Sequence, residues 1–242
     1  MSAIDEVARE LADRAAALPA AHRHRRIFID TYRRTTLAVG AAVEAAHFED
    51  PDWVSEWDVA FAELYLHAHD ADRDDGVVPR PWRLAFGAPA DLPPLRHVLL
   101  GINAHVNYDL PQALLAVISD DQFTDDVVLD RRRRDHERID AVLAGRVAAE
   151  DDELGGARTL VDRILTPLNR LGSKRFLREA RQKVWHNTVE LQQARLNGTQ
   201  AYDARLAELE VLAAARIADL LAPGQVLLRL AVAGFGVVLP PP

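Results

Sequence analysis

Apolar side chains recur along this chain of 242 residues at the three- and four-residue spacing of an amphipathic helix. Runs that alternate apolar and polar residues between tight turns, the pattern typical of strands, are almost absent. The sequence therefore predicts an all-α protein built as a multi-helix bundle. Internal repeats and low-complexity linkers are not evident, so residues 1–242 are expected to form a single helical domain.

Prolines, glycines and short polar runs separate the expected helices. We expect PRPWRLAFG to form a short turn, SDDQFT to break two long helices, and Thr124 to cap the helix that follows. The expected helices cover about residues 3–17, 24–47, 52–75, 93–118, 125–149, 157–170, 174–197 and 202–221, and a last apolar segment follows residues 222–224.

The motif GINAHVNYDLP, residues 101–111, interrupts a long apolar stretch. LPPLRHVLL precedes it and QALLAVI follows it, and both flanks are typical of buried helix. Burying a carboxylate such as Asp109 without a compensating partner would be costly. The interruption therefore predicts a polar site inside the bundle. Its five hydrogen-bonding residues are Asn103, His105, Asn107, Tyr108 and Asp109.

A histidine and an aspartate occur four residues apart in two successive helices, as His105 with Asp109 and as His136 with Asp140. This spacing puts both side chains of a pair on one helix face. In an antiparallel hairpin that turns between residues 122 and 123, His105 would lie level with Asp140 and Asp109 level with His136. Helices packed about 8–10 Å apart could then bring the two pairs together.

Two imidazoles and two carboxylates inside a helical bundle are ligands suited to a dimetal centre. Such a centre needs further ligands. Asp58, in the apolar run WDVAFAELYL, is the first candidate, and His186 in KVWHNTVEL is the second. Lower-ranked candidates are Glu63, Glu190 and His67.

Two simpler interpretations stay open for these motifs, namely solvated helix faces or a buried salt-bridge network. The second motif lies in the highly charged run RRRRDHERID, whose residues Arg131–Arg134 we expect to form a solvated face that pairs with local acids. Asn103, Asn107 and Tyr108 are candidates for catalytic residues that contact the ligands or the substrate. They could equally serve as caps near the kink that Pro111 should impose, or as a structural network.

Composition excludes several kinds of protein. The formal net charge of −8 argues against a nucleic-acid partner, and the absence of cysteine excludes disulfides, thiolate zinc sites and iron–sulfur clusters. The N-terminus lacks the pattern of a signal peptide. The apolar run at residues 226–240 is interrupted and shorter than the roughly 20 residues that a membrane span needs. We therefore expect a cytoplasmic protein without a membrane partner.

The segments GINAHVNYDLP and DHERID resemble the hallmark of a bacterial all-helical family of unknown function, and the likeness extends through DVAFAELY, PRPWRLAF and KVWHN. The chain also resembles the non-heme diiron monooxygenases of platensimycin-type diterpenoid biosynthesis. That resemblance implies an all-helical enzyme with two iron ions that uses dioxygen as co-substrate. It implies metal ligation by His105, Asp109, His136 and Asp140, with Asp58 added. The ferritin-like pattern of Glu and ExxH repeats is absent.

The first functional hypothesis is accordingly a diiron monooxygenase that hydroxylates an apolar small-molecule substrate, such as a terpenoid or an acyl thioester in antibiotic biosynthesis. The second is a dimetal hydrolase, in which paired metals activate water. The third is a non-catalytic helical protein whose polar cluster fixes helix register. The sequence identifies neither the electron donor nor the oligomeric state. GxSxG, GxGxxG, Walker and HExxH motifs are missing.

Overall fold

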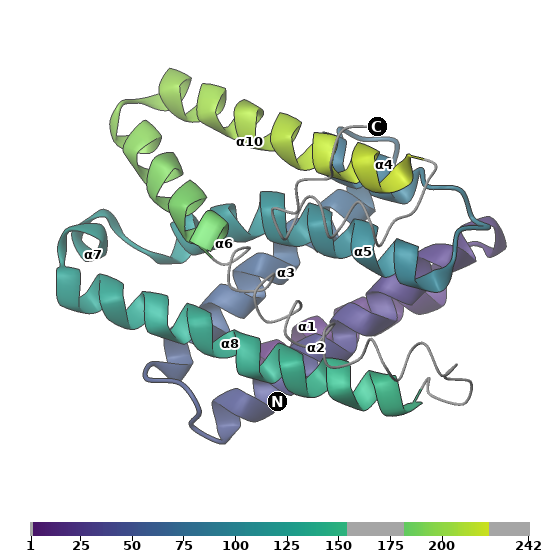
Figure 1. Cartoon of the computed structure of the whole chain (residues 1–242), viewed down its shortest axis with the longest axis horizontal. Coiled ribbons are helices and arrows are strands. Elements are labelled where there is room, and N and C mark those ends of the chain that lie inside the picture. The colour runs from purple at the N-terminus through teal and green to yellow at the C-terminus, as the bar shows by residue number, and fades with distance from the viewer. Residues whose placement is uncertain (1, 154–181, 223–242) are drawn as a thin grey trace, which may run out of the picture.

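The computed structural model describes residues 2–153 and 182–222, and every regular element within these ranges is helical (Figure 1). The all-α prediction is therefore confirmed for the described part of the chain. Residues 182–196 form a helix, whereas the expected helix at 157–170 and the apolar run at 226–240 lie outside the described residues. The remaining elements are α1 (Ala3–Ala17), η1 (Ala20–Arg25), α2 (Arg26–Glu44), α3 (Pro51–Arg73), α4 (Arg80–Phe86), α5 (Pro94–Ala104), the π-helical η2 (His105–Asp109), α6 (Leu110–Val117), α7 (Asp120–Thr124), α8 (Asp126–Glu153) and α10 (Thr199–Leu221).

Local signals place the starts of the first long helices. The Ser2 side chain accepts a hydrogen bond from the Asp5 amide, and the Asp5 carboxylate accepts one from the Ser2 amide, so the two form a capping box at α1. Asp50 caps α3 by accepting from the Trp53 amide, and Pro51 occupies the first turn, where its missing N–H is harmless.

Two local predictions were wrong. PRPWRLAFG does not form a turn but the helix α4, because Pro81 is tolerated in a first helical turn while Trp82 and Phe86, one turn apart, are buried together. Asp125, and not Thr124, caps α8: its Oδ1 accepts from the Val127 and Val128 amides at 3.0 and 3.1 Å.

The helices enclose a core that is rich in aromatic side chains. α3 packs against α1, α2 and α6, and α10 lies along α4 and α5 (Figure 1). One cluster of the core includes Phe28, Tyr65 and Trp82, and a second includes Trp57 and Leu114. Within the described ranges, no helix is long and apolar enough to cross a membrane.

The antiparallel course expected around residues 122 and 123 is present, but in the described part of the chain the close packing of the two hairpin helices is not, because α8 packs against α2 and α7. The α5–η2–α6 run and α8 cross the molecule in opposite directions, and α7 lies at the turn between them (Figure 1). α8 packs against α2 and α7, whereas η2 packs against α3 and α10. The two motifs of the hairpin therefore meet other helices, and both have a contact with α3, η2 by packing and His136 through the Trp57 ring.

Candidate functional site

The motif GINAHVNYDLP contains a single π-helical turn, His105–Asp109, between α5 and α6. Pro111 lies two residues after this turn, and its ring would clash with the Asn107 carbonyl in a regular α-helix. A π turn, whose hydrogen bonds reach five residues back, widens the helix where that clash would fall. Such turns are frequent at functional sites, so the irregular backbone agrees with the polar interruption in the sequence.

The amide side chains around the π turn bond to the backbone. Asn103 Nδ2 donates to the Leu99 carbonyl at 2.8 Å, and Asn107 Nδ2 donates to the Asn103 carbonyl at 3.0 Å. Tyr108 is buried in a separate cluster with Leu191, and its pKa is raised mainly by burial. These contacts support the structural alternative for Asn103, Asn107 and Tyr108, while their catalytic role stays a prediction.

His105 and Asp109 contact each other directly. His105 Nδ1 lies 2.8 Å from Asp109 Oδ2, and Trp82 Nε1 donates to the same oxygen at 2.7 Å. The side chains of His105 and Asp109 are 4 % and 2 % exposed. The indole and the carboxylate therefore hold the imidazole in one orientation.

Burial dominates the protonation of this pair. It lowers the pKa of His105, although the hydrogen bond and the charge of Asp109 act in the opposite direction. It raises the pKa of Asp109, against the lowering effects of His105 and Trp82. Both pKa shifts disfavour the form in which His105 is positively charged and Asp109 is negatively charged. While the pair is buried without a cation, one proton is therefore held between the imidazole and the carboxylate.

Aromatic rings surround the imidazole of His105. Phe61 stacks on it with a centroid distance of 3.5 Å, and Tyr32 meets it edge-on at 4.6 Å. His105 Nε2 is buried and has no hydrogen-bond partner among the residues that the structure describes. The nitrogen opposite the Asp109 contact is therefore the one that an outside group can use.

Asp58 lies one turn before Phe61 on α3 and is 8 % exposed. Burial raises its pKa to about 7, and its Oδ2 lacks a hydrogen-bond partner within the described part of the chain. The pKa of Tyr32 is raised first by burial and next by the charges of Asp58 and Asp109. Asp58 is thus a buried acid on the helix whose Phe61 stacks on the His105 ring.

His136, on α8, is fully buried. Its ring centroid lies 5.4 Å from that of Trp57 and 5.8 Å from that of Trp185. Trp57 and Phe61, the neighbours of His136 and His105, are one turn apart on α3. The two histidines are therefore linked through α3, a connection that the hairpin argument missed.

The pairing of His105 with Asp140 stays a prediction, because the Asp140 side chain lies outside the described residues. The pairing of Asp109 with His136 also stays a prediction, and the contacts that Asp109 makes in the structure are with His105 and Trp82. His186, the other proposed ligand, has an exposed side chain, and so do the lower-ranked Glu63, Glu190 and His67. Among the side chains that the structure does describe, no three His, Asp or Glu residues form a group that could hold a metal ion.

A network of charges anchors α8 beside the site. The Asp135 carboxylate accepts from the Glu49 and Asp50 amides at 2.8 Å each, just before α3 begins. Arg134 and Arg138 pair with Glu49 at 2.9 and 2.8 Å. Arg133 pairs with Asp130, so the prediction that Arg131–Arg134 pair with acids is confirmed for Arg133 and Arg134.

Three neighbours of His105, namely Trp82, Phe61 and Tyr32, were not predicted from the sequence. PRPWRLAF and DVAFAELY contained a signal, because bulky aromatic residues there recur at helical spacing. Nothing in a single sequence shows which polar group the Trp82 indole will meet, since 27 positions separate it from Asp109.

Comparison with known proteins identifies a family of unknown function (DUF5995), whose model matches residues 4–223. The match covers most of the chain, and the chain belongs to this family. No curated protein and no solved structure matches it.

Proposed function

We propose that the chain is a non-heme diiron monooxygenase, which hydroxylates an apolar small molecule with dioxygen as co-substrate. The observation that carries the proposal is the environment of His105. One ring nitrogen is fixed by Asp109, and the other is buried without a partner among the described residues. Histidines that bind metals commonly hand their second nitrogen to a carboxylate in this way.

The donor atoms suit iron. His105 Nε2 and the Asp58 carboxylate are a nitrogen and an oxygen donor on neighbouring elements, and both are buried. Imidazole and carboxylate are the ligand types of non-heme iron sites. We propose His136 and Asp140 from α8 as the ligands that complete the centre.

In this proposal, Asp109 orients His105 and does not bind metal itself. Its Oδ2 already accepts from Trp82 and lies in hydrogen-bonding distance of His105. A carboxylate in that position raises the basicity of the imidazole and fixes the ring. The exposed His186 is left out of the ligand set.

Each part of the site has a distinct task. Iron would supply the one-electron and dioxygen chemistry that none of these side chains can perform. Phe61, Tyr32 and Trp82 exclude water from the His105 ring, which strengthens electrostatic interactions around it. Ionised Asp58 would balance part of the charge of the metal.

Iron binding tests the proposal. Protein purified without chelators and reconstituted with ferrous iron should hold stoichiometric iron, and both His105→Ala and Asp58→Ala should lose it while circular dichroism shows unchanged helicity. His186→Ala removes an exposed histidine and serves as the matched control, with full iron content expected.

The opposite results are equally clear. Absence of stoichiometric metal after reconstitution with iron or manganese would overturn the proposal and favour the non-catalytic interpretation. Bound zinc in a colourless protein that rejects iron would favour the hydrolase. Loss of iron in His186→Ala, with retention in His105→Ala, would place the centre elsewhere.

A further inference from the structure

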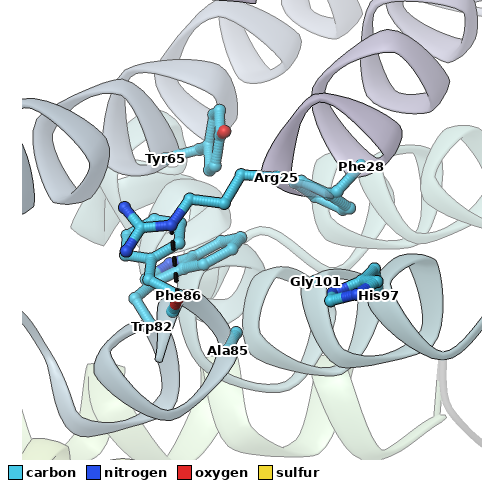
Figure 2. A pocket seen from close by; sticks show the side chains of 8 residues that line it. All are labelled: Arg25, Phe28, Tyr65, Trp82, Ala85, Phe86, His97 and Gly101. Atoms are coloured by element: carbon cyan, nitrogen blue, oxygen red, sulfur yellow. Dashed lines mark hydrogen bonds between the residues drawn. The ribbon is translucent and has the colours of Figure 1, made fainter. Parts of the chain in front are cut away.

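A pocket lies beside the candidate site, where η1, α2, α3, α4 and α5 meet (Figure 2). Aromatic rings form much of its wall, and the side chains of Arg25 and His97 lie among them. The lining residues that matter here are Phe28, Tyr65, Trp82, Phe86, Arg25 and His97.

Three side chains of the pocket wall also surround His105. The ring centroids of Phe28, Tyr65 and Trp82 lie 6.4, 6.0 and 5.7 Å from that of His105. A molecule in the pocket would therefore be separated from His105 by a single layer of aromatic side chains. The pocket is therefore next to the candidate centre and shares its aromatic wall.

Gly101 allows Phe28 to lie against α5 at this point. A Cβ atom on Gly101 would lie 2.2 Å from Phe28 Cδ2, far inside van der Waals contact. Gly101 lies one turn before His105, and its lack of a side chain makes room for Phe28. The close packing of this ring gives the pocket a fixed wall on that side.

His97 supplies an unused hydrogen-bonding atom at the pocket. It is 5 % exposed, its ring lies 5.0 Å from that of His24, and its Nε2 has no hydrogen-bond partner among the described residues. Burial lowers the pKa of His97, so the ring is neutral near pH 7, while the Ala90 carbonyl interacts with a ring N–H. With that proton on Nδ1, Nε2 is an acceptor.

Arg25 does not offer a free positive charge to a ligand. Its guanidinium pairs with Asp72, its Nε donates to the Phe86 carbonyl at 3.2 Å, and it lies 5.1 Å from the centre of the Phe86 ring. Figure 2 shows the Arg25 side chain stretched across the pocket. The free space is about 20 Å³, which is room for about one water molecule, so a ring-sized ligand needs Arg25 to move aside.

We propose that this pocket binds a neutral, ring-shaped apolar molecule that carries a hydroxyl group, and that Arg25 swings out to admit it. The rings of Phe28, Tyr65 and Trp82 contact the apolar body, and the hydroxyl donates to His97 Nε2. Identification of this ligand as the substrate rests on the proposed function, but the binding itself does not.

Three probes of similar shape separate the ligand classes, namely 4-methylphenol, toluene and 4-methylbenzoate. We expect 4-methylphenol to bind about tenfold more tightly than toluene, the ratio that one added hydrogen bond gives. 4-Methylbenzoate should bind most weakly, because Asp72 already neutralises Arg25. Binding is followed by ligand-observed NMR, and the ¹⁵N resonance of His97 Nε2 should shift with 4-methylphenol alone.

Variants locate the binding. Arg25→Ala should bind 4-methylphenol at least tenfold more tightly than the wild type. If the alanine variant does not fold, Arg25→Met is measured in its place. Arg26→Ala is the control, because this neighbouring arginine pairs with Asp30 at the surface and should leave binding unchanged. His97→Leu should remove the preference for 4-methylphenol over toluene.

The binding measurements are made on protein from which metal has been removed with a chelator. Their outcome therefore does not depend on whether the protein binds iron. Tightest binding of 4-methylbenzoate would overturn the neutral ligand class. Equal affinities for toluene and 4-methylphenol, or an unchanged preference in His97→Leu, would overturn the role of His97. Absence of binding to folded Arg25→Ala and Arg25→Met would overturn the pocket itself.

Discussion

Two buried carboxylates beside α3 have opposite environments. Asp135, which is fully buried, meets the start of α3 and accepts from two backbone amides and from Arg138 at 3.1 Å. Asp58, in the middle of α3, has an oxygen without a hydrogen-bond partner in the described part of the chain, and burial raises its pKa to about 7.

The contrast distinguishes Asp135, a carboxylate that stabilises the fold, from Asp58, a carboxylate suited to binding a cation. Donors that surround a buried carboxylate stabilise its charge, whereas a buried charge without donors destabilises the fold. Asp135 contributes to holding α8 against α3. Asp58 costs stability until a cation or a proton neutralises it, which is the behaviour expected of a proposed metal ligand.

Asp58→Asn gives the largest expected effect. In metal-free protein, the native pKa of about 7 exceeds the unfolded value of 3.8, so the native state binds more protons between these values and stability falls as pH rises. The variant should match the wild type near pH 4 and exceed it by about 4 kcal/mol above pH 7. Urea unfolding across this range measures the difference.

A flat difference between pH 4 and pH 8 would contradict this assignment of Asp58. Glu63→Gln, which removes an exposed acid on the same helix, is the control and should follow the wild-type profile. Saturating iron should cancel the advantage of Asp58→Asn, because a bound cation stabilises the ionised carboxylate.

Asp135→Asn should change stability in the opposite direction. The amide can satisfy one of the two backbone N–H groups but not both, and it loses the charge that Arg138 stabilises. We expect a loss of about 3 kcal/mol near pH 7, measured by urea unfolding. Asp130→Asn, at an exposed pair with Arg133, should stay within about 0.5 kcal/mol of the wild type. If Asp135→Asn and Asp130→Asn changed the free energy of unfolding equally, Asp135 would have no special structural role.

Trp82→Phe tests whether Asp109, like Asp135, is stabilised by a hydrogen-bond donor, or, like Asp58, is buried without one. The change keeps an aromatic ring but deletes the N–H that donates to Asp109, so we expect a loss of about 2 kcal/mol in stability. Iron affinity, measured by chelator competition, should fall about tenfold because the imidazole loses part of its support.

Trp53→Phe is the matched control, since its indole donates to the Val117 carbonyl at 3.3 Å and not to a proposed site residue. It should lower stability without changing iron affinity. Equal losses of iron affinity in both tryptophan variants would argue that Trp82 acts only through packing.

The sequence predicted much of the helical layout for simple physical reasons. The apolar spacing and the prolines and glycines that interrupt it act over a few residues, so the approximate ends of α1 and α3 could be located from local pattern. α4 was missed because two prolines suggest a turn, and only the burial of Trp82 and Phe86 in the folded protein favours a helix there.

The candidate site was predictable only in part. The four-residue spacing of His105 and Asp109 anticipated that they would lie close together, and the apolar flanks anticipated their burial. The roles of Trp82 and Phe61 depend on contacts between distant segments, which periodicity does not encode. Spacing alone likewise could not distinguish a carboxylate that binds a cation from one that holds a histidine.

The π turn at His105–Asp109 fixes the rotational frame of everything that follows it. A turn closed over five residues contains one residue more than an α-helical turn, and each residue rotates a helix by about 100°. The wider turn absorbs this extra residue, so Leu110 and Leu114 of α6 stay buried in the core. Deleting one residue of the turn, such as Val106, would restore a regular α-helix in that same rotational frame. Deleting a residue of α6 itself, where no wide turn absorbs the change, would rotate the residues after it by about 100°.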